Sequence, residues 1–155
     1  MKKGWAFWLA TWFGCGLAPV APGTAGSLGA LLVAWPLSLA QGARPYWFLG
    51  LALVLLLPAI RSATLVAVGL NLKDPQLVVV DEVVGQWITL AGATRLSPVS
   101  FLLAFILFRG FDIWKPPPIR RIEQLPGGTG IVLDDALAGV YGGLILYLLG
   151  RLHLY

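Results

Sequence analysis

The long charge-free stretch near the start of the chain limits the fold more than any other feature. Residues 4–43 carry no acidic or basic side chain, and the glycines and prolines of GCGLAPVAPGTAGS, residues 14–27, interrupt this apolar run. Glycine and proline break helices and favour turns, so the region cannot form one continuous helix. The chain is 58% hydrophobic and 12% charged, whereas soluble domains carry about 25% charged residues. These features predict short apolar helices that associate with a membrane.

Apolar segments separated by Gly, Pro and Arg predict an all-α fold. The expected helices cover residues 28–43, 46–60, about 76–93, 99–108 and 131–150. Arg61 is expected to end the second helix, Ser27 to cap the first, and Pro36 to kink it. Residues 1–155 are long enough for a single domain. Only the last segment approaches the ~20 apolar residues that a membrane span needs, so a compact bundle at the membrane and a multi-pass bundle both stay open.

The basic residues predict an orientation in the membrane. If residues 28–60 and 76–108 form two hairpins, each tip carries one basic residue, Arg44 or Arg95. The open ends carry most of the others, namely Lys2, Lys3, Arg61, Lys73, Arg109, Lys115, Arg120 and Arg121. The positive-inside rule then places the open ends in the cytoplasm. The net charge of +4 suits anionic membrane lipid, and the lack of a long basic stripe argues against nucleic acid as a partner.

Acidic side chains are few, and they are placed where solvation alone would not put them. The chain has seven Asp and Glu residues, none of them before Asp74. Five lie in three apolar segments and on the same side of the two-hairpin arrangement, namely Asp81, Glu82, Asp112, Asp134 and Asp135. Buried carboxylates must be paired, protonated or bound to a cation. Because Mg²⁺ takes carboxylates, waters and phosphate oxygens, the five acids predict a metal site.

Helical spacing places two of these acids on faces of small residues. The first face consists of Glu82, Gly85, Gln86, Thr89 and Gly92, and the second of Asp135, Ala138, Gly139, Gly142 and Gly143. Small residues let another helix or a ligand approach closely. For the small residues alone, we favour simple helix packing as the interpretation. For the five acids together, we favour a metal site.

Two further features predict phosphate binding. Arg109 and Lys115 lie three residues either side of Asp112, and Arg and Lys are the side chains that grip phosphate. The APGTAGS segment offers backbone N–H groups and the Thr24 and Ser27 hydroxyls at a helix start. The sequence lacks a P-loop and a Cys-x5-Arg motif, and its one histidine lies at the C-terminal end. Metal-assisted attack by water and attack by a carboxylate both remain open.

Four ordered motifs resemble the phosphatidylglycerophosphatase A family. They are GCGLAPVAPGTAGSLGALLVAW, DPQLVVVDEVVGQWITL, FRGFDIWKPPPIRRIE and GGTGIVLDDALAGVYGG, and they cover most of residues 11–146. The resemblance implies a mostly helical fold around a central helix. It also implies a Mg²⁺-dependent lipid phosphatase that converts phosphatidylglycerophosphate to phosphatidylglycerol at the cytoplasmic face of the bacterial inner membrane.

The same resemblance implies residue roles. The metal ligands would be drawn from Asp81, Glu82, Asp112, Asp134 and Asp135, which together with Lys115 would form the catalytic set. The phosphate-binding set would be Thr24, Gly26, Ser27 and Lys115, with Pro22 and Gly23 in the same glycine-rich motif. Arg109 joins this set because of its spacing to Asp112 and not because of the resemblance. The alternative is a small cation transporter or channel subunit, which predicts acids spread along a path through the membrane. The oligomeric state stays open.

Overall fold

The computed structural model describes residues 4–155, so Lys2 and Lys3 lie outside the described part of the chain. The elements are α1 (Trp5–Ala10), the 3₁₀ turn η1 (Cys15–Leu17), α2 (Pro22–Ser38), α3 (Tyr46–Leu70), α4 (Val80–Ala91), α5 (Pro98–Trp114), α6 (Ile119–Ile122) and α7 (Gly128–Arg151). Residues 4–155 contain no β-strand. The prediction of an all-α fold is therefore confirmed.

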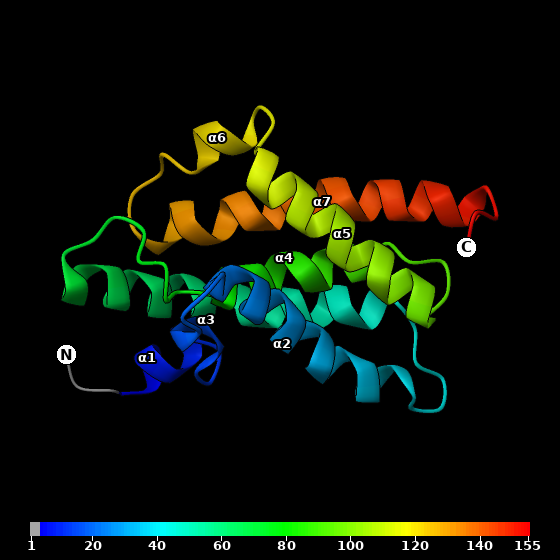
Figure 1. The fold of residues 1–155 in the computed structure, drawn as a ribbon, viewed down its shortest axis with the longest axis horizontal. Helices are drawn as coiled ribbons and strands as arrows, with labels where there is room; N and C mark the ends of the chain where they lie inside the picture. The colour runs from blue at the N-terminus through cyan, green and yellow to red at the C-terminus, as the bar shows by residue number, and fades with distance from the viewer. Residues whose placement is uncertain (1–3) are drawn as a thin grey trace.

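The helix α4 forms the centre of the bundle. It packs against α1, α2, α3, α5 and α7, and Figure 1 shows it between α7 and α3. Most of its twelve residues are buried, including the acid Asp81 and the polar residues Gln86 and Thr89. A helix buried on nearly every side must be surrounded by other helices. The central helix expected from the resemblance is thus present.

Small residues let α4 and α7 touch along their backbones. A Cβ atom added to Gly139 would collide with the backbone of Gly85, and one added to Gly92 would collide with the backbone of Gly143. The Thr89 hydroxyl bridges the pair, since Oγ1 lies 3.0 Å from the carbonyl oxygen of Gly85 and 3.1 Å from that of Gly139. Helix packing is therefore the correct interpretation of the two small faces.

Four helices extend beyond the limits predicted from the sequence, among them α7, which covers Gly128–Arg151 where residues 131–150 were predicted. The prediction that Arg61 ends a helix is wrong, because α3 continues to Leu70, and arginine is a good helix former. The helix predicted over residues 99–108 continues to Trp114, so Arg109 and Asp112 are helical.

The helix predicted over residues 28–43 begins at Pro22 and ends at Ser38. Proline fits the first position of a helix because the N–H that it lacks would have no partner there. Ser27 does not cap this helix; Ala21 holds the cap position, and the Ser27 hydroxyl donates to the carbonyl of Gly23 at 3.0 Å.

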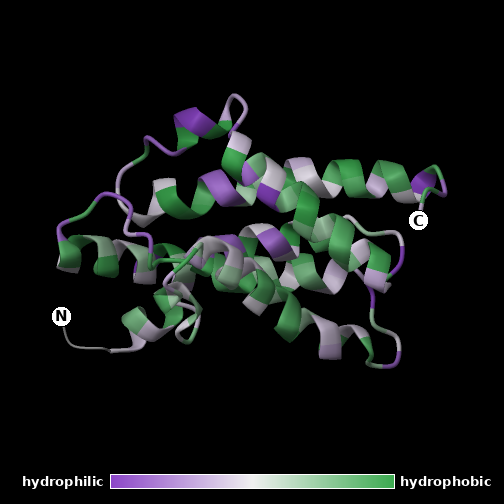
Figure 2. Ribbon diagram, viewed as in Figure 1, coloured by the Kyte–Doolittle hydropathy of each residue, from purple (hydrophilic) through white to green (hydrophobic). Residues whose placement is uncertain are grey.

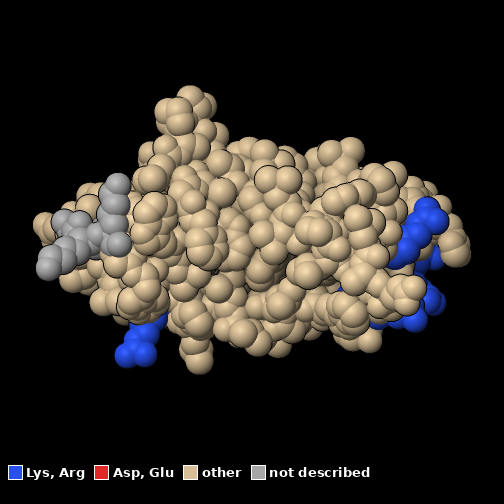
Figure 3. Space-filling view, turned by 90° about the horizontal axis from the view of Figure 1, so that it is seen from below, with Lys and Arg blue, Asp and Glu red and all other residues tan. Residues whose placement is uncertain are grey.

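Within residues 4–155, two helices, α3 and α7, are long and apolar enough to cross a membrane. The expectation that only the last segment approaches this length is corrected, because α3 does not stop at Arg61. Apolar residues cover much of the ribbon in Figure 2, and many large apolar side chains are exposed. Figure 3 shows a face with Lys and Arg only toward its two ends and with no Asp or Glu. A face with so many exposed apolar side chains and so few charges indicates membrane association.

The connections give the bundle two different ends. The α2–α3 and α4–α5 loops lie at one end, together with the C-terminus (Figure 1). The other end holds the α3–α4 loop, the start of α7 and the segment around α6. The segments in which five of the acids were predicted to converge all meet toward this second end.

Candidate active site

A polar cavity of about 380 Å³ lies where α2, α4 and α7 begin and α5 ends. Its charged lining consists of Asp74, Asp81, Glu82, Arg109, Asp112, Lys115, Asp134 and Asp135. The structure therefore brings together all six residues that the sequence predicted to be catalytic, along with Arg109. The three segments that carry them are far apart in the chain, so tertiary packing of α4, α5 and α7 creates the cavity.

Local structure places each charged group toward the cavity. Asp81 and Glu82 occupy the first turn of α4, where the positive end of the helix dipole stabilises negative charge. Asp134 and Asp135 lie about two turns into α7, beside α4. Lys115 follows the last turn of α5 in a left-handed backbone conformation with φ of 46°. This conformation ends the helix at the cavity.

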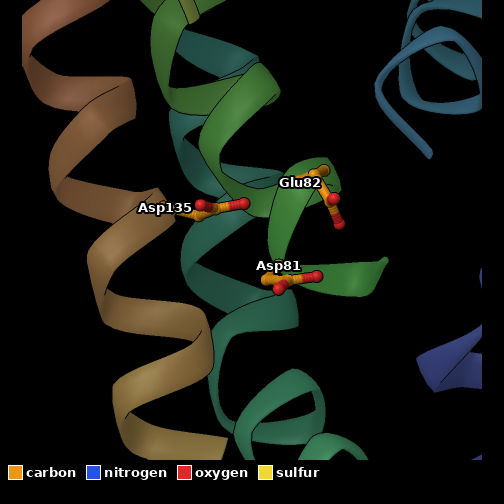
Figure 4. A group of neighbouring side chains, drawn as sticks. All are labelled: Asp81, Glu82 and Asp135. Atoms are coloured by element: carbon orange, nitrogen blue, oxygen red, sulfur yellow. The ribbon is translucent and has the colours of Figure 1, made fainter. Parts of the chain in front are cut away.

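Three carboxylates form a tight cluster within the cavity. Asp81, Glu82 and Asp135 each offer an oxygen atom, and these atoms lie within 4.8 Å of one another. In Figure 4, Asp135 extends from α7 toward α4, where Asp81 and Glu82 lie on the first turn. The buried oxygens Asp81 Oδ1 and Glu82 Oε2 have no hydrogen-bond partner among the described residues. Unpartnered buried carboxylate oxygens are suited to bind a hard cation.

Without a bound cation, the protein environment disfavours the state in which all three carboxyl groups of the cluster are ionised. Burial raises the pKa of Glu82 to about 7. Burial also raises the pKa of Asp81 well above its usual range, and the nearby charges of Glu82 and Asp135 raise it further. Without a cation these groups therefore retain protons that exposed carboxylates would lose. The donor set and its buried free oxygens fit a divalent metal ion.

Two basic side chains border the carboxylate cluster. Arg109 Nη1 lies 2.5 Å from Asp112 Oδ2 and 3.7 Å from Glu82 Oε1, while the buried Arg109 Nε has no partner among the described residues. Lys115 Nζ lies 2.6 Å from Asp134 Oδ2 and 3.3 Å from Glu123 Oε1.

Burial alone would lower the pKa of Lys115, but the hydrogen bond and charge of Asp134 outweigh it and raise the pKa above its ordinary value. Lys115 therefore stays protonated.

The predicted metal ligands thus fall into two groups in the structure. Three of them form the cluster. The other two form ion pairs with basic side chains, Asp112 with Arg109 and Asp134 with Lys115.

The predicted phosphate-binding residues of the glycine-rich segment lie beside the cavity but do not line it. Gly26 packs against Val79, where an added Cβ would approach the Val79 side chain to 2.7 Å. Ser27 is buried with its hydroxyl bonded to a backbone carbonyl, and Thr24 is also absent from the cavity lining. Their role in phosphate binding stays a prediction.

Several further residues lie at the cavity; of these, Pro22 and Gly23 belong to the glycine-rich motif that the resemblance implied, whereas the others had no predicted role. Residues 21–23 line it directly, and a Cβ at Gly23 would collide with Glu82 Oε1 and come within 3.1 Å of Arg109 Nη1. Asp74 also lines the cavity, and Glu123 reaches Lys115 from the segment after α6. The Asp74-Pro75 pair close before the Asp81-Glu82 pair was a signal for Asp74, whereas no local pattern pointed to Glu123.

The fold and the cavity define a class: helical, membrane-associated proteins whose buried carboxylates suit a divalent cation and whose Arg and Lys suit a phosphate. Within that class, the chain belongs to the phosphatidylglycerophosphatase A family, whose model matches residues 8–150.

Curated relatives support this membership, because each match covers most of the relative's length. Phosphatidylglycerophosphatase A of Escherichia coli strain K12 is 35% identical over 154 residues, covering 92% of this chain and 82% of the relative. The protein of the same name from Haemophilus influenzae is 39% identical over 140 residues, covering 90% and 85%. A Bacteroides thetaiotaomicron protein, provisionally named phosphatidylinositol-3-phosphatase, is 38% identical over 142 residues and is covered to 89%. No solved structure matches the chain significantly.

Proposed function

We propose that the protein is a Mg²⁺-dependent lipid phosphatase that hydrolyses phosphatidylglycerophosphate to phosphatidylglycerol and phosphate. Membership of the family and the names of two relatives support the reaction. The observation that carries the proposal is the cluster of Asp81, Glu82 and Asp135 in the same cavity as Arg109 and Lys115. A phosphomonoester needs positive charge around its oxygens, and Arg109 and Lys115 supply it in this cavity.

The three clustered carboxylates would hold the metal ion. When bound, Mg²⁺ would act as a Lewis acid that polarises the phosphoryl group. The chain's own cations supply the remaining charge. Arg109 has an unpartnered buried Nε, which is free to donate to a phosphate oxygen. Asp112 and Asp134 hold the Arg109 and Lys115 head groups at the cavity, so these cations are positioned before substrate arrives.

The position of the cavity supports a site that faces the cytoplasm at the inner membrane. Lys73, Arg109, Lys115, Arg120 and Arg121 belong to the cavity end or the adjoining segment, whereas the opposite end carries Arg44, Arg95 and Arg151. The positive-inside rule favours the more basic end in the cytoplasm.

The transporter alternative predicts a different arrangement of acids. A cation path needs carboxylates distributed through the depth of the bundle. Instead, all seven acids line the polar cavity or lie beside it, since Glu123 reaches Lys115 and the other six belong to the cavity lining. This grouping supports a reaction site at one end of the molecule.

The test is phosphate release by purified protein in detergent. Phosphatidylglycerophosphate is supplied with Mg²⁺ and then with excess chelator, and phosphatidylinositol 3-phosphate is run in parallel because one relative carries that substrate in its name. We expect chelator-sensitive release that is faster with phosphatidylglycerophosphate. Release only from phosphatidylinositol 3-phosphate would keep the phosphatase reaction but would replace phosphatidylglycerophosphate as the proposed substrate. No release from folded protein under any condition would reject the phosphatase proposal and call for cation-flux measurements in liposomes.

A further inference from the structure

An apolar groove of about 530 Å³ lies between α2 and α5. The helix α2 lines it with Leu28, Leu31, Leu32 and Trp35, and α5 lines it with Phe101, Leu102 and Phe105. No charged or hydrogen-bonding side chain other than the Trp35 indole is part of this lining. At one end Trp35 meets Phe101 edge to face, with ring centroids 5.0 Å apart. The groove is therefore a site for an apolar ligand.

The groove and the polar cavity follow one another along the same two helices. On α5, Phe101, Phe105, Arg109 and Asp112 are spaced by four, four and three residues, which places them on one helix face. The first two line the groove and the last two line the cavity. One face of α5 thus changes from apolar to charged toward the C-terminal end of the helix.

The helix α2 also contributes to both sites, from its start to the polar cavity and from its middle to the groove, although the residues concerned lie on different faces of the helix. Gly23, at its start, lines the polar cavity, and Leu28 opens the apolar groove. Five residues of helix separate them, which corresponds to roughly 7 Å along the axis. Between Phe105 and Arg109 on α5 the separation is four residues, or roughly 6 Å. A single amphipathic ligand could therefore occupy the cavity with its polar end and the groove with its apolar end.

We propose that the α2–α5 groove binds one acyl chain of the phospholipid whose phosphate occupies the polar cavity. This inference rests on the proposed function for the identity of the headgroup. An acyl chain is the occupant because it needs no hydrogen bonds and the groove offers almost none, whereas a peptide would bring backbone N–H and C=O groups that require partners. Leu32 and Leu102 are largely exposed, so the groove is open to lipid along its side.

Such a groove would give the enzyme a way to select a lipid phosphate over a soluble one. Binding of a chain between α2 and α5 would fix the position of the headgroup relative to Arg109. It would also favour substrates with chains long enough to reach Trp35. The prediction is a difference in specificity between long- and short-chain substrates, not a general loss of activity.

Two double variants test whether the groove binds an acyl chain, and the substituted positions in the two variants have similar exposed fractions. Leu32→Trp and Leu102→Trp together narrow the groove at positions that are 76% and 59% exposed. Leu57→Trp and Leu144→Trp together are the control, at positions outside the groove that are 74% and 58% exposed. The readout is kcat/KM for a long-chain phosphatidylglycerophosphate divided by kcat/KM for a very short-chain analogue, in mixed micelles of constant composition.

We expect the groove variant to lower this ratio by roughly tenfold or more, since a hydrophobic pocket discriminates by about that factor per methylene. The control variant should keep the wild-type ratio. Equal ratios in both variants would overturn the inference and identify the groove as ordinary lipid-facing surface. If the wild-type protein released no phosphate from either substrate, the proposed function would fail instead.

A binding measurement keeps the inference testable without turnover. Phosphatidic acid with a photoreactive group midway along one chain is crosslinked to the full-length protein in detergent. The adducts should concentrate on peptides from α2 and α5, and a diacylglycerol with the same chain should label them less. Uniform labelling of the exposed faces of α3 and α7 by both lipids would overturn the inference.

Discussion

Asp81 and Asp135 reach the same small volume from two different helices, although like charges at this distance repel. Burial removes the water that would screen them, and the unpartnered Asp81 Oδ1 shows that no donor among the described residues takes its place. The arrangement is unfavourable for folding alone. At the residue scale it is therefore best explained by a ligand that the three carboxylates share.

Substitution of Asp81 by Asn should remove most activity while leaving the fold intact. The amide has nearly the same size as the carboxyl but carries no negative charge, so the cluster loses part of its affinity for a cation. We expect kcat to fall by roughly two orders of magnitude or more. Circular dichroism and the elution volume in detergent should match the wild type. Full phosphatase activity in a folded Asp81→Asn sample would exclude a catalytic role for this residue.

Removal of the metal should be visible as a change in stability. Mg²⁺ that binds only the native state raises its stability by about 2.7 kcal/mol at a hundredfold excess over Kd. We expect Mg²⁺ to raise the melting temperature of the wild type and excess chelator to reverse it. Asp135→Asn should lack most of this shift, whereas Asp112→Asn should keep it, because Asp112 pairs with Arg109 outside the cluster. The opposite ranking of the two variants would contradict the three-carboxylate site.

The sequence was sufficient to predict seven of the eight charged residues that line the cavity, but it missed Asp74 and did not show how the acids divide into two groups. An acid in an apolar helix carries a cost that signals a partner, and this signal identified Asp81, Glu82, Asp112, Asp134 and Asp135. Spacing along one helix does not reveal which side chain lies across from another helix. The ion pair of Asp134 with Lys115 depends on how α5 ends against α7, and only the tertiary structure shows it.

At the scale of elements, the contact of α4 with α7 positions the carboxylate cluster. Two of the three carboxylates lie on α4 and the third on α7, so the distance between these helices sets the size of the site. An added Cβ at Gly139 would meet the Gly85 carbonyl and Cα of α4. Glycine here serves close helix approach, as in small-residue contacts within membranes.

Gly139→Ala should therefore destabilise the protein and weaken the site together. Overpacking of a tight contact costs roughly 1–3 kcal/mol, and the displacement would move Asp135 away from Asp81. Gly50→Ala on α3 is the matched control, because its Cβ would meet no atom within 4 Å. Alanine is the better helix former, so Gly50→Ala should be neutral or more stable by about 0.5–1 kcal/mol. Thermal unfolding and phosphate release would both be measured. Equal stability and equal activity of the two variants would refute the role of Gly139 in the close contact between α4 and α7.

Helix limits show where local signals stop being sufficient. Arg61 lies within α3 rather than at its end, because a single charged residue does not break a helix that has favourable packing on other faces. Pro22 starts α2 although a glycine-rich segment follows it, since that segment lies against Val79 and Glu82 and tertiary contacts support the helix there. Propensity alone predicts neither result.

For the whole molecule, the pattern of connections separates the polar cavity from the opposite end of the bundle. The two-hairpin arrangement predicted from the sequence is consistent with both loops, α2–α3 and α4–α5, lying away from the cavity (Figure 1). On the face shown in Figure 3, the uncharged middle part matches the part of a bundle that contacts hydrocarbon. A substrate headgroup would then meet the cavity at one membrane surface.

This arrangement predicts that the two ends lie on opposite sides of the membrane. Gln41, in the α2–α3 connection, and Gln124, between α6 and α7, are both exposed and lie at opposite ends of the fold. In a Cys15→Ser background, Gln41→Cys should react with a membrane-impermeant maleimide in intact bacterial spheroplasts. Gln124→Cys should react only after lysis, because the more basic cavity end belongs in the cytoplasm. Phosphatase activity of both variants controls for correct folding.

The alternative outcomes distinguish three placements of the bundle. Reaction of both cysteines only after lysis would mean that the bundle lies on the cytoplasmic surface, with α3 and α7 covered by protein or lipid on one side. Reaction of Gln124→Cys alone in intact spheroplasts would reverse the orientation and place the cavity outside. Labelling of Gln41→Cys before lysis and of Gln124→Cys after it would place the cavity at the cytoplasmic surface of a bundle that spans the membrane. The chain and the headgroup of a cytoplasmic-leaflet lipid would then enter the α2–α5 groove and the polar cavity from the same side.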